Sequence, residues 1–225
     1  MKAVASKDMP ASDLVIGYLG LRRAVGIIGT ALPFVLVVGR WVLDGWGIQS
    51  SISAYYYTSM RDVFVGSICA IGVFLLSYRG YERADDIAGN LACVFAAGLA
   101  LLPTSPLTGA SAAQTLVGHI HLTCASAFFL TLAYFSLVLF RKTNPAKQMT
   151  GRKKERNVVY TVCGYTILAC IALVAVDFAF LKDSAVQAID PVFWLESAAV
   201  LAFGISWLTK GETILADVAT EQLPS

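Results

Sequence analysis

The sequence predicts an all-α protein, a polytopic transmembrane bundle of six helices, and two observations support this prediction. Of the 225 residues, 57% are hydrophobic and 14% are charged, whereas about 25% of the residues of a soluble domain carry a charge. Six apolar stretches also follow one another along the chain, each near the length of about 20 residues that a helix needs to cross a bilayer. A mean hydropathy of +0.68 agrees with both observations.

The expected spans are separated by polar or turn-forming segments. They lie near 24–43, 61–79, 87–103, 119–140, 158–180 and 192–209. Pro103, Pro106 and Gly109 interrupt the chain after the third span, and Pro191 suits the first turn of the sixth. Residues 1–21 and 210–225 are expected to be tails. The sequence therefore predicts one membrane domain over residues 1–225.

The basic residues predict the orientation of this domain. Only Arg40, Arg61 and Lys182 of the 17 Lys and Arg residues fall on one side of the expected membrane. Cytoplasmic segments carry the excess of Lys and Arg, so both termini are expected in the cytoplasm. The basic loop 141–157 has the charge that this rule demands, and it could also bind anionic lipid or a partner protein. We expect a multi-pass protein of the bacterial inner (plasma) membrane.

The charge balance and the cysteines exclude several classes of protein. A formal net charge of +2 does not support a nucleic-acid binder that works by bulk charge. The five cysteines all fall inside expected spans and form no CxxC pair, so neither a disulfide framework nor a zinc ribbon is predicted. The partners we expect are membrane lipid and, as an option, a second copy of the chain.

Phenolic and ionisable side chains gather at the outer ends of the expected helices. Ionisable residues within membrane helices are costly and usually face the bundle interior or a cavity. We therefore expect an outward-facing polar and aromatic pocket that binds a lipid head group or small amphiphile without a cofactor. The residues that would ring this pocket are Tyr55, Tyr56, Tyr57, Arg61, Asp62, His121, Asp177 and Glu196.

The same residues leave alternatives open. A zinc-dependent hydrolase of a lipid amide or ester would use His119, His121 and Asp62 as metal ligands. Its catalytic candidates are Asp62, as general base, with His121 and Ser53. Both histidines can reach one ion only if the fourth helix starts after His119, because side chains two residues apart on a helix point about 200° apart.

Three further interpretations compete with these. A serine hydrolase would combine Ser50, Ser51 or Ser53 with His121 and a carboxylate, but no G-x-S-x-G motif is present. A small-solute or proton-coupled transporter would be expected to show internal repeats or broken helices, and we see neither in the sequence. An interfacial network in which Arg61 pairs with an acid needs no ligand at all.

Three short motifs carry a family resemblance. They are the run 51–66 (SISAYYYTSMRDVFVG), the segment Leu101–Thr104, and His119–Leu122 followed by Phe128 and Phe129. Over roughly residues 20–210 the chain resembles bacterial six-helix membrane proteins of unknown function. These are distantly similar to the DRAM and Sfk families and, more remotely, to the alkaline ceramidase and progestin-receptor superfamily.

The resemblance implies a six-helix fold and, through the ceramidase branch, a zinc site with three histidines, a serine and an aspartate. Ser51 or Ser53, Asp62 and His121 match part of this set. The chain has only two histidines, so Asp177 or Glu196 would have to replace a missing ligand.

Small residues at four-residue spacing predict close contacts between helices in lipid. The two examples are Gly66 with Ala70, and Gly89 with Cys93 and Ala97.

Overall fold

The computed structural model describes residues 11–78, 82–106, 108–143 and 150–216, and these residues form helices and loops without strands. Parts of the predicted tails and of the basic loop 141–157 lie outside the described residues. The six long helices are α1 Ala11–Leu43, α2 Arg61–Leu76, α3 Arg83–Leu101, α4 Ala112–Tyr134, α5 Gly151–Val176 and α6 Pro191–Lys210. The prediction of an all-α fold with six helices is confirmed.

Four short helical segments complete the fold. The 3-10 helices η1 (Ser53–Tyr57) and η4 (Ala185–Ile189) lie in the loops before α2 and α6. The π-helices η2 (Phe135–Leu139) and η3 (Asp177–Leu181) continue α4 and α5. Such wide turns within helices are rare and often occur near functional sites.

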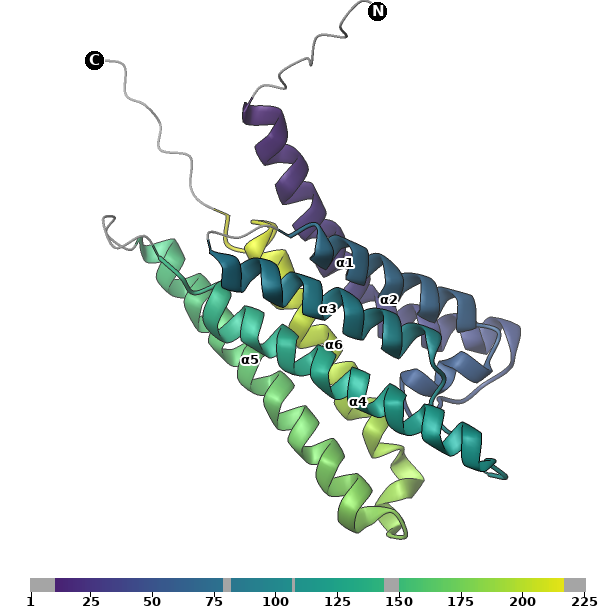
Figure 1. Cartoon of the computed structure of the whole chain (residues 1–225). Coiled ribbons are helices and arrows are strands. Elements are labelled where there is room, and N and C mark those ends of the chain that lie inside the picture. The colour runs from purple at the N-terminus through teal and green to yellow at the C-terminus, as the bar shows by residue number, and fades with distance from the viewer. Residues whose placement is uncertain (1–10, 79–81, 107, 144–149, 217–225) are drawn as a thin grey trace, which may run out of the picture.

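The six helices form a closed ring. Each packs against its neighbours in sequence, and α6 closes the ring by packing along α1. The N-terminal end of α1 and the C-terminal end of α6 lie at the same end of the ring, which we call the termini end (Figure 1). The loops that follow α1, α3 and α5 make up the other end, which we call the loop end.

Five of the described helices are long and apolar enough to cross a membrane. The exception is α2, whose 16 residues span about 24 Å, less than the roughly 30 Å of a bilayer's hydrocarbon core. The large hydrophobic side chains that point outward, such as Phe34, Val94 and Val162, are suited to lipid contact. The described helices thus have the character of a multi-pass membrane protein.

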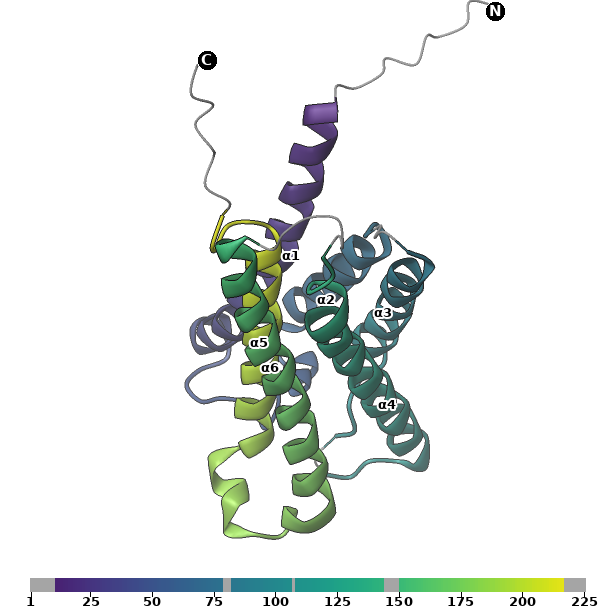
Figure 2. The same ribbon diagram turned by 90° about the vertical axis from the view of Figure 1, so that its left-hand side faces the viewer.

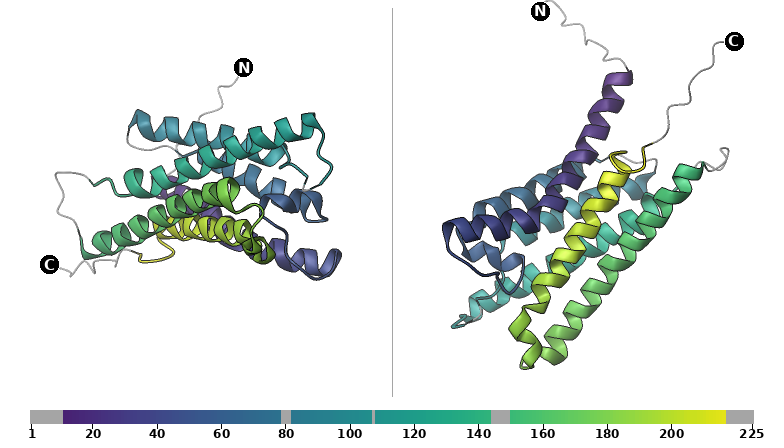
Figure 3. Two further views of the ribbon diagram at one scale, coloured as in Figure 1. Left: turned by 90° about the horizontal axis from the view of Figure 1, so that it is seen from below. Right: turned by 180° about the vertical axis from the view of Figure 1, so that it is seen from behind.

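Three helices begin well before the apolar spans predict, and one of them is α5, which starts at Gly151 instead of near residue 158. The first helix starts at Ala11 instead of near residue 24, and it bends along its length (Figure 3). Pro33 inside α1 removes one backbone hydrogen bond, which accounts for a bend. The fourth helix starts at Ala112 instead of near residue 119, because Ser111 and Gln114 form a capping box at its first turn.

Buried aromatic rings fill the termini end of the ring. The Trp207 ring lies 5.1 Å from Phe140, 5.6 Å from Tyr78 and 5.7 Å from Phe135, centroid to centroid. Aromatic pairs in tilted or edge-to-face geometry add about 0.5–1.5 kcal/mol each beyond their buried area. This cluster joins α6 to α2 and to the end of α4, and it fixes the positions of the charged residues around it.

The small residues that the sequence singles out behave differently from one another. A Cβ atom at Gly89 would lie 2.6 Å from the Leu75 carbonyl oxygen, so Gly89 allows the α2 and α3 backbones to approach closely. Gly66 has nothing within 4 Å of the same position and is exposed. The predicted close contact is therefore confirmed for Gly89 and wrong for Gly66.

Candidate functional site

Glu196 on α6 forms hydrogen bonds with the loop between α1 and α2 at the loop end. Its Oε2 atom accepts hydrogen bonds from the backbone N–H groups of Ile52, at 2.7 Å, and Ser53, at 3.2 Å. Both donors belong to buried residues at the N-terminus of η1. The carboxylate therefore satisfies two orphan donors and ties the loop between α1 and α2 to α6. Ser53, predicted as a candidate nucleophile, is held here as part of this buried turn.

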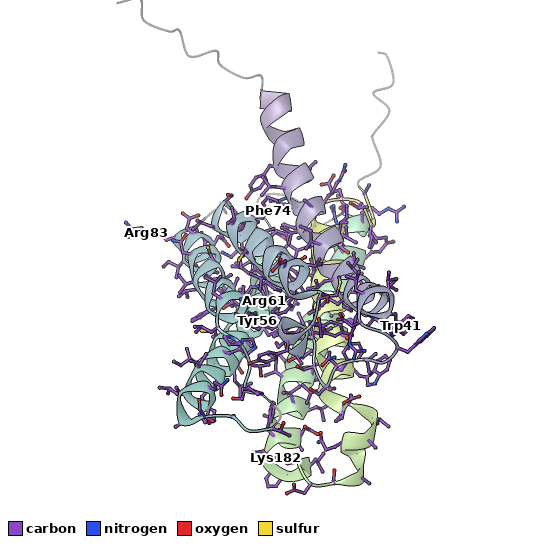
Figure 4. All side chains as sticks on the ribbon, turned by 90° about the vertical axis from the view of Figure 1, so that its right-hand side faces the viewer. Trp41, Tyr56, Arg61, Phe74, Arg83 and Lys182 are labelled. Atoms are coloured by element: carbon purple, nitrogen blue, oxygen red, sulfur yellow. The ribbon has the colours of Figure 1, made fainter. Side chains whose placement is uncertain are left out.

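The three tyrosines of η1 point to three different places. Tyr55 is fully buried and packs 6.3 Å from the Phe193 ring. Tyr56 accepts a 2.8 Å hydrogen bond from Arg61, whose guanidinium lies 4.5 Å from the Tyr56 ring centre (Figure 4). Tyr57 is exposed and donates to the Thr104 carbonyl oxygen at 2.6 Å. The three side chains therefore do not line one pocket mouth. Burial raises the pKa of both the Tyr55 and the Tyr57 phenol.

A polar hollow of about 490 Å³ lies at the loop end, and Tyr57 is one of its lining residues. Its carboxylate, Asp44, accepts hydrogen bonds from the Ser59 side chain and from the Ser59 backbone N–H. These bonds lower the pKa of Asp44. Arg40, on the same hollow, donates to the Gly47 carbonyl oxygen at 2.7 Å. The polar groups here hold the loop that follows α1.

The two histidines lie on opposite faces of one continuous helix. Since α4 begins at Ala112, His119 and His121 are well inside it, and the expectation that they open the helix is wrong. His119 is exposed, whereas His121 is 3% exposed and its Nδ1 lies 2.7 Å from the Leu102 carbonyl oxygen. A carbonyl can only accept, so Nδ1 carries the proton. His121 thus caps the C-terminus of α3.

Replacing His121 by leucine is expected to lower the free energy of unfolding by about 1–3 kcal/mol, because the Leu102 carbonyl loses its donor in a partly buried site. The exposed His119→Leu is the control and should change stability by no more than about 0.5 kcal/mol. Both values can be measured by denaturant titration of the detergent-solubilised protein. Equal losses for the two variants would contradict the capping role.

Asp177 and Asp62 have separate surroundings. Asp177, the first residue of η3, is buried and accepts a 2.8 Å hydrogen bond from the Gln187 side chain. This bond joins the π-helix to η4 across the loop between α5 and α6. Asp62 is exposed in the first turn of α2.

The metal ligands suggested by the sequence do not fit a zinc site. Within the described residues, no group of three or more His, Cys, Asp and Glu side chains is placed to hold a metal ion. His119 and His121 point apart, and the Nδ1 atom of His121 is already engaged. We therefore derive no reaction step through a metal.

A half-open cavity of about 370 Å³ separates α4 from α5 and α6 toward the loop end. Figure 2 shows α4 diverging from the α5–α6 pair in this direction. The cavity is lined mainly by apolar side chains, and its polar residues are Ser126 and Glu196. The lining residues are Leu122, Ala125, Ser126, Phe129, Cys170, Ile171, Val174, Ala175, Phe178, Ala179, Leu195, Glu196 and Ala199.

Among the predicted pocket residues, Glu196 alone lines this cavity. The sequence missed the apolar walls, because Leu, Val and Ala on three membrane-type helices give no signal that distinguishes a cavity from ordinary packing. A gap left by small side chains between neighbouring helices can be recognised only once the helices are assembled.

Comparison with known proteins adds no family to this description. Neither a protein-family model, nor a curated protein, nor a solved structure matches the chain. The class of the protein is therefore defined by its own fold: an all-helical ring with five described helices that are long and apolar enough to cross a membrane.

Proposed function

We propose that this protein binds a lipid or a small amphiphile in the cavity between α4, α5 and α6, without a covalent step. The observation that carries the proposal is a largely apolar cavity of about 370 Å³ with a carboxylate on its wall. Ligand sites of this kind are typically apolar with a few placed polar groups that orient the ligand. Here an acyl chain would contact Phe129, Ile171 and Val174, and the polar end would meet Glu196.

Glu196 also suggests the polarity of the ligand. Its Oε2 atom is occupied by the two η1 backbone donors, and within the described part of the chain no group donates to Oε1. A carboxylate oxygen beside an apolar cavity favours a ligand that donates a hydrogen bond, such as a hydroxyl, an amide or an amine. Ser126 offers a second hydroxyl on the same wall.

The membrane setting belongs to the same proposal. The distribution of Lys and Arg supports cytoplasmic termini in a bacterial inner membrane. The cavity would then lie in the outer half of the bilayer, since its residues come from the loop-end halves of α4, α5 and α6. An amphiphile could enter sideways from the lipid.

The test uses two exposed alanines on α5. Ala175 lines the cavity and Ala172 does not, so Ala175→Phe fills the site and Ala172→Phe is its matched control. We expect Ala175→Phe to weaken binding of a lysolipid with an NBD-labelled acyl chain at least tenfold, and to remove copurifying lipid detected by mass spectrometry. Glu196→Gln, which keeps an acceptor for η1, should weaken binding while the protein stays folded. Equal binding by both alanine variants would refute the proposal.

A further inference from the structure

Four basic side chains converge at the termini end of the ring, far from the cavity. They are Arg22 on α1, Lys153 and Arg156 on α5, and Lys210 at the end of α6. Lys153 and Lys210 meet at Phe140, because the Lys153 Nζ donates to the Phe140 carbonyl oxygen at 2.7 Å and the Lys210 Nζ lies against the Phe140 ring. The charges of Arg22 and Arg156 also act on Lys210, and Asp85 opposes them. Arg156 is only 9% exposed. Like charges repel one another when partly shielded from water, so this arrangement calls for a compensating anion.

Aromatic rings lie against three of these cations, one of which is Lys153, with its Nζ 5.8 Å from the centre of the Tyr160 ring. The Arg22 guanidinium carbon lies 4.4 Å from the centre of the Tyr18 ring and 5.6 Å from that of Tyr78. The Lys210 Nζ lies 5.3 Å from the centre of the Phe140 ring. Contacts between a cation and a ring face leave the N–H donors of the cation free for another acceptor. The rings therefore orient the donors without satisfying them.

The two neighbouring acids differ, since Asp85 pairs with Lys142 outside the cluster and Glu212 pairs with Arg156 within it. Asp85, 2% exposed, accepts from Lys142 at 3.2 Å, and Glu212 lies 3.6 Å from Arg156. In the described ranges, neither Arg22 nor Lys210 forms an ion pair, and the Nε atom of Arg22 is buried without a hydrogen-bond acceptor. A buried donor on a charged group that lacks an acceptor is costly. An anionic oxygen that approached the Arg22 guanidinium would therefore be stabilised.

We propose that Arg22, Lys210 and the neighbouring Lys153 and Arg156 form a binding site for a phosphate group. A phosphate offers several charged acceptor oxygens, which suits donors that arrive from three helices, and the planar guanidinium of Arg22 can donate two parallel hydrogen bonds to it. The phosphate can belong to the head group of an anionic lipid or to a free phosphorylated molecule. The site is independent of the cavity between α4, α5 and α6, because it shares no residue with it.

The test compares substitutions at the same end of the molecule. Lys210→Gln and Arg22→Gln each remove one donor, and Lys210→Arg keeps the charge. Lys154→Gln is the matched control, since Lys154 is exposed on the first turn of α5 and outside the cluster. The full chain in neutral detergent is titrated with inorganic phosphate, and the chain in nanodiscs of phosphatidylcholine is compared with nanodiscs that contain phosphatidic acid. Binding is read by calorimetry and by the melting temperature.

Each outcome decides the question. We expect Lys210→Gln and Arg22→Gln to weaken binding about tenfold or more, with Lys210→Arg and Lys154→Gln close to the wild type. Binding of inorganic phosphate would identify a site for free phosphorylated molecules, and binding seen only with phosphatidic acid would identify a lipid head-group site. If neither probe binds, or if Lys154→Gln weakens binding as much as Lys210→Gln does, the proposal is overturned.

Discussion

Glu196→Ala is expected to lower the free energy of unfolding by about 2–6 kcal/mol, the sum of two buried backbone donors that each cost about 1–3 kcal/mol when left without an acceptor. The donors are the N–H groups of Ile52 and Ser53, which both lie in buried residues. Water cannot readily replace the carboxylate there, because Ile52 is 3% exposed. Denaturant titration in detergent measures the loss.

The matched variant is Glu196→Gln, which removes the charge but keeps a carbonyl oxygen in nearly the same place. It should retain most of the stability that the alanine variant loses. Amide hydrogen exchange gives an independent readout, since the Ile52 and Ser53 amides should exchange much faster in Glu196→Ala than in Glu196→Gln. If the two variants lose the same stability, the negative charge and not the hydrogen bonding anchors η1, and the anchoring described above is incorrect.

This anchor illustrates how far a sequence predicts a site. Glu196 was a candidate because a carboxylate one turn inside an apolar helix is unusual. Its partners are backbone groups 143 and 144 residues away in the chain, and backbone donors have no sequence signature. The sequence could therefore indicate that Glu196 matters, but not that it caps a 3-10 helix instead of joining the histidines.

The helices were more predictable than their ends. Apolar runs long enough for a bilayer indicate each helix directly, and all six are present. Polar residues near the start of a helix interrupt such runs, so α1, α4 and α5 extend beyond them. The earlier start of α4 changed the interpretation of the site, because it places His119 and His121 on opposite faces. The Ser111–Gln114 capping box was the signal in the sequence that could have corrected this.

The contact between α1 and α6 closes the ring, and Gly204 is the residue that allows it. A Cβ atom at Gly204 would lie 2.6 Å from the Thr30 backbone nitrogen and 3.0 Å from the Gly26 carbonyl oxygen. In the same way, a Cβ atom at Gly26 would lie 2.7 Å from the Leu208 backbone nitrogen. Two backbones that touch cannot yield as a flexible side chain can. In lipid, where helices associate mainly through such packing, a larger residue must push the helices apart.

Gly204→Leu is therefore expected to lower the free energy of unfolding by about 3 kcal/mol or more, at the upper end of overpacking effects. Gly66→Ala is the control, since nothing lies within 4 Å of its Cβ position. It should raise stability by about 0.5–1 kcal/mol through the higher helix propensity of alanine. Both can be followed by unfolding in mixed detergent micelles.

Because Arg22 and Lys210 lie on these same two helices, Gly204→Leu should also weaken phosphate binding, whereas Gly66→Ala should not. A destabilised Gly66→Ala, or a Gly204→Leu variant as stable as the wild type, would contradict the view that close backbone packing between α1 and α6 closes the ring.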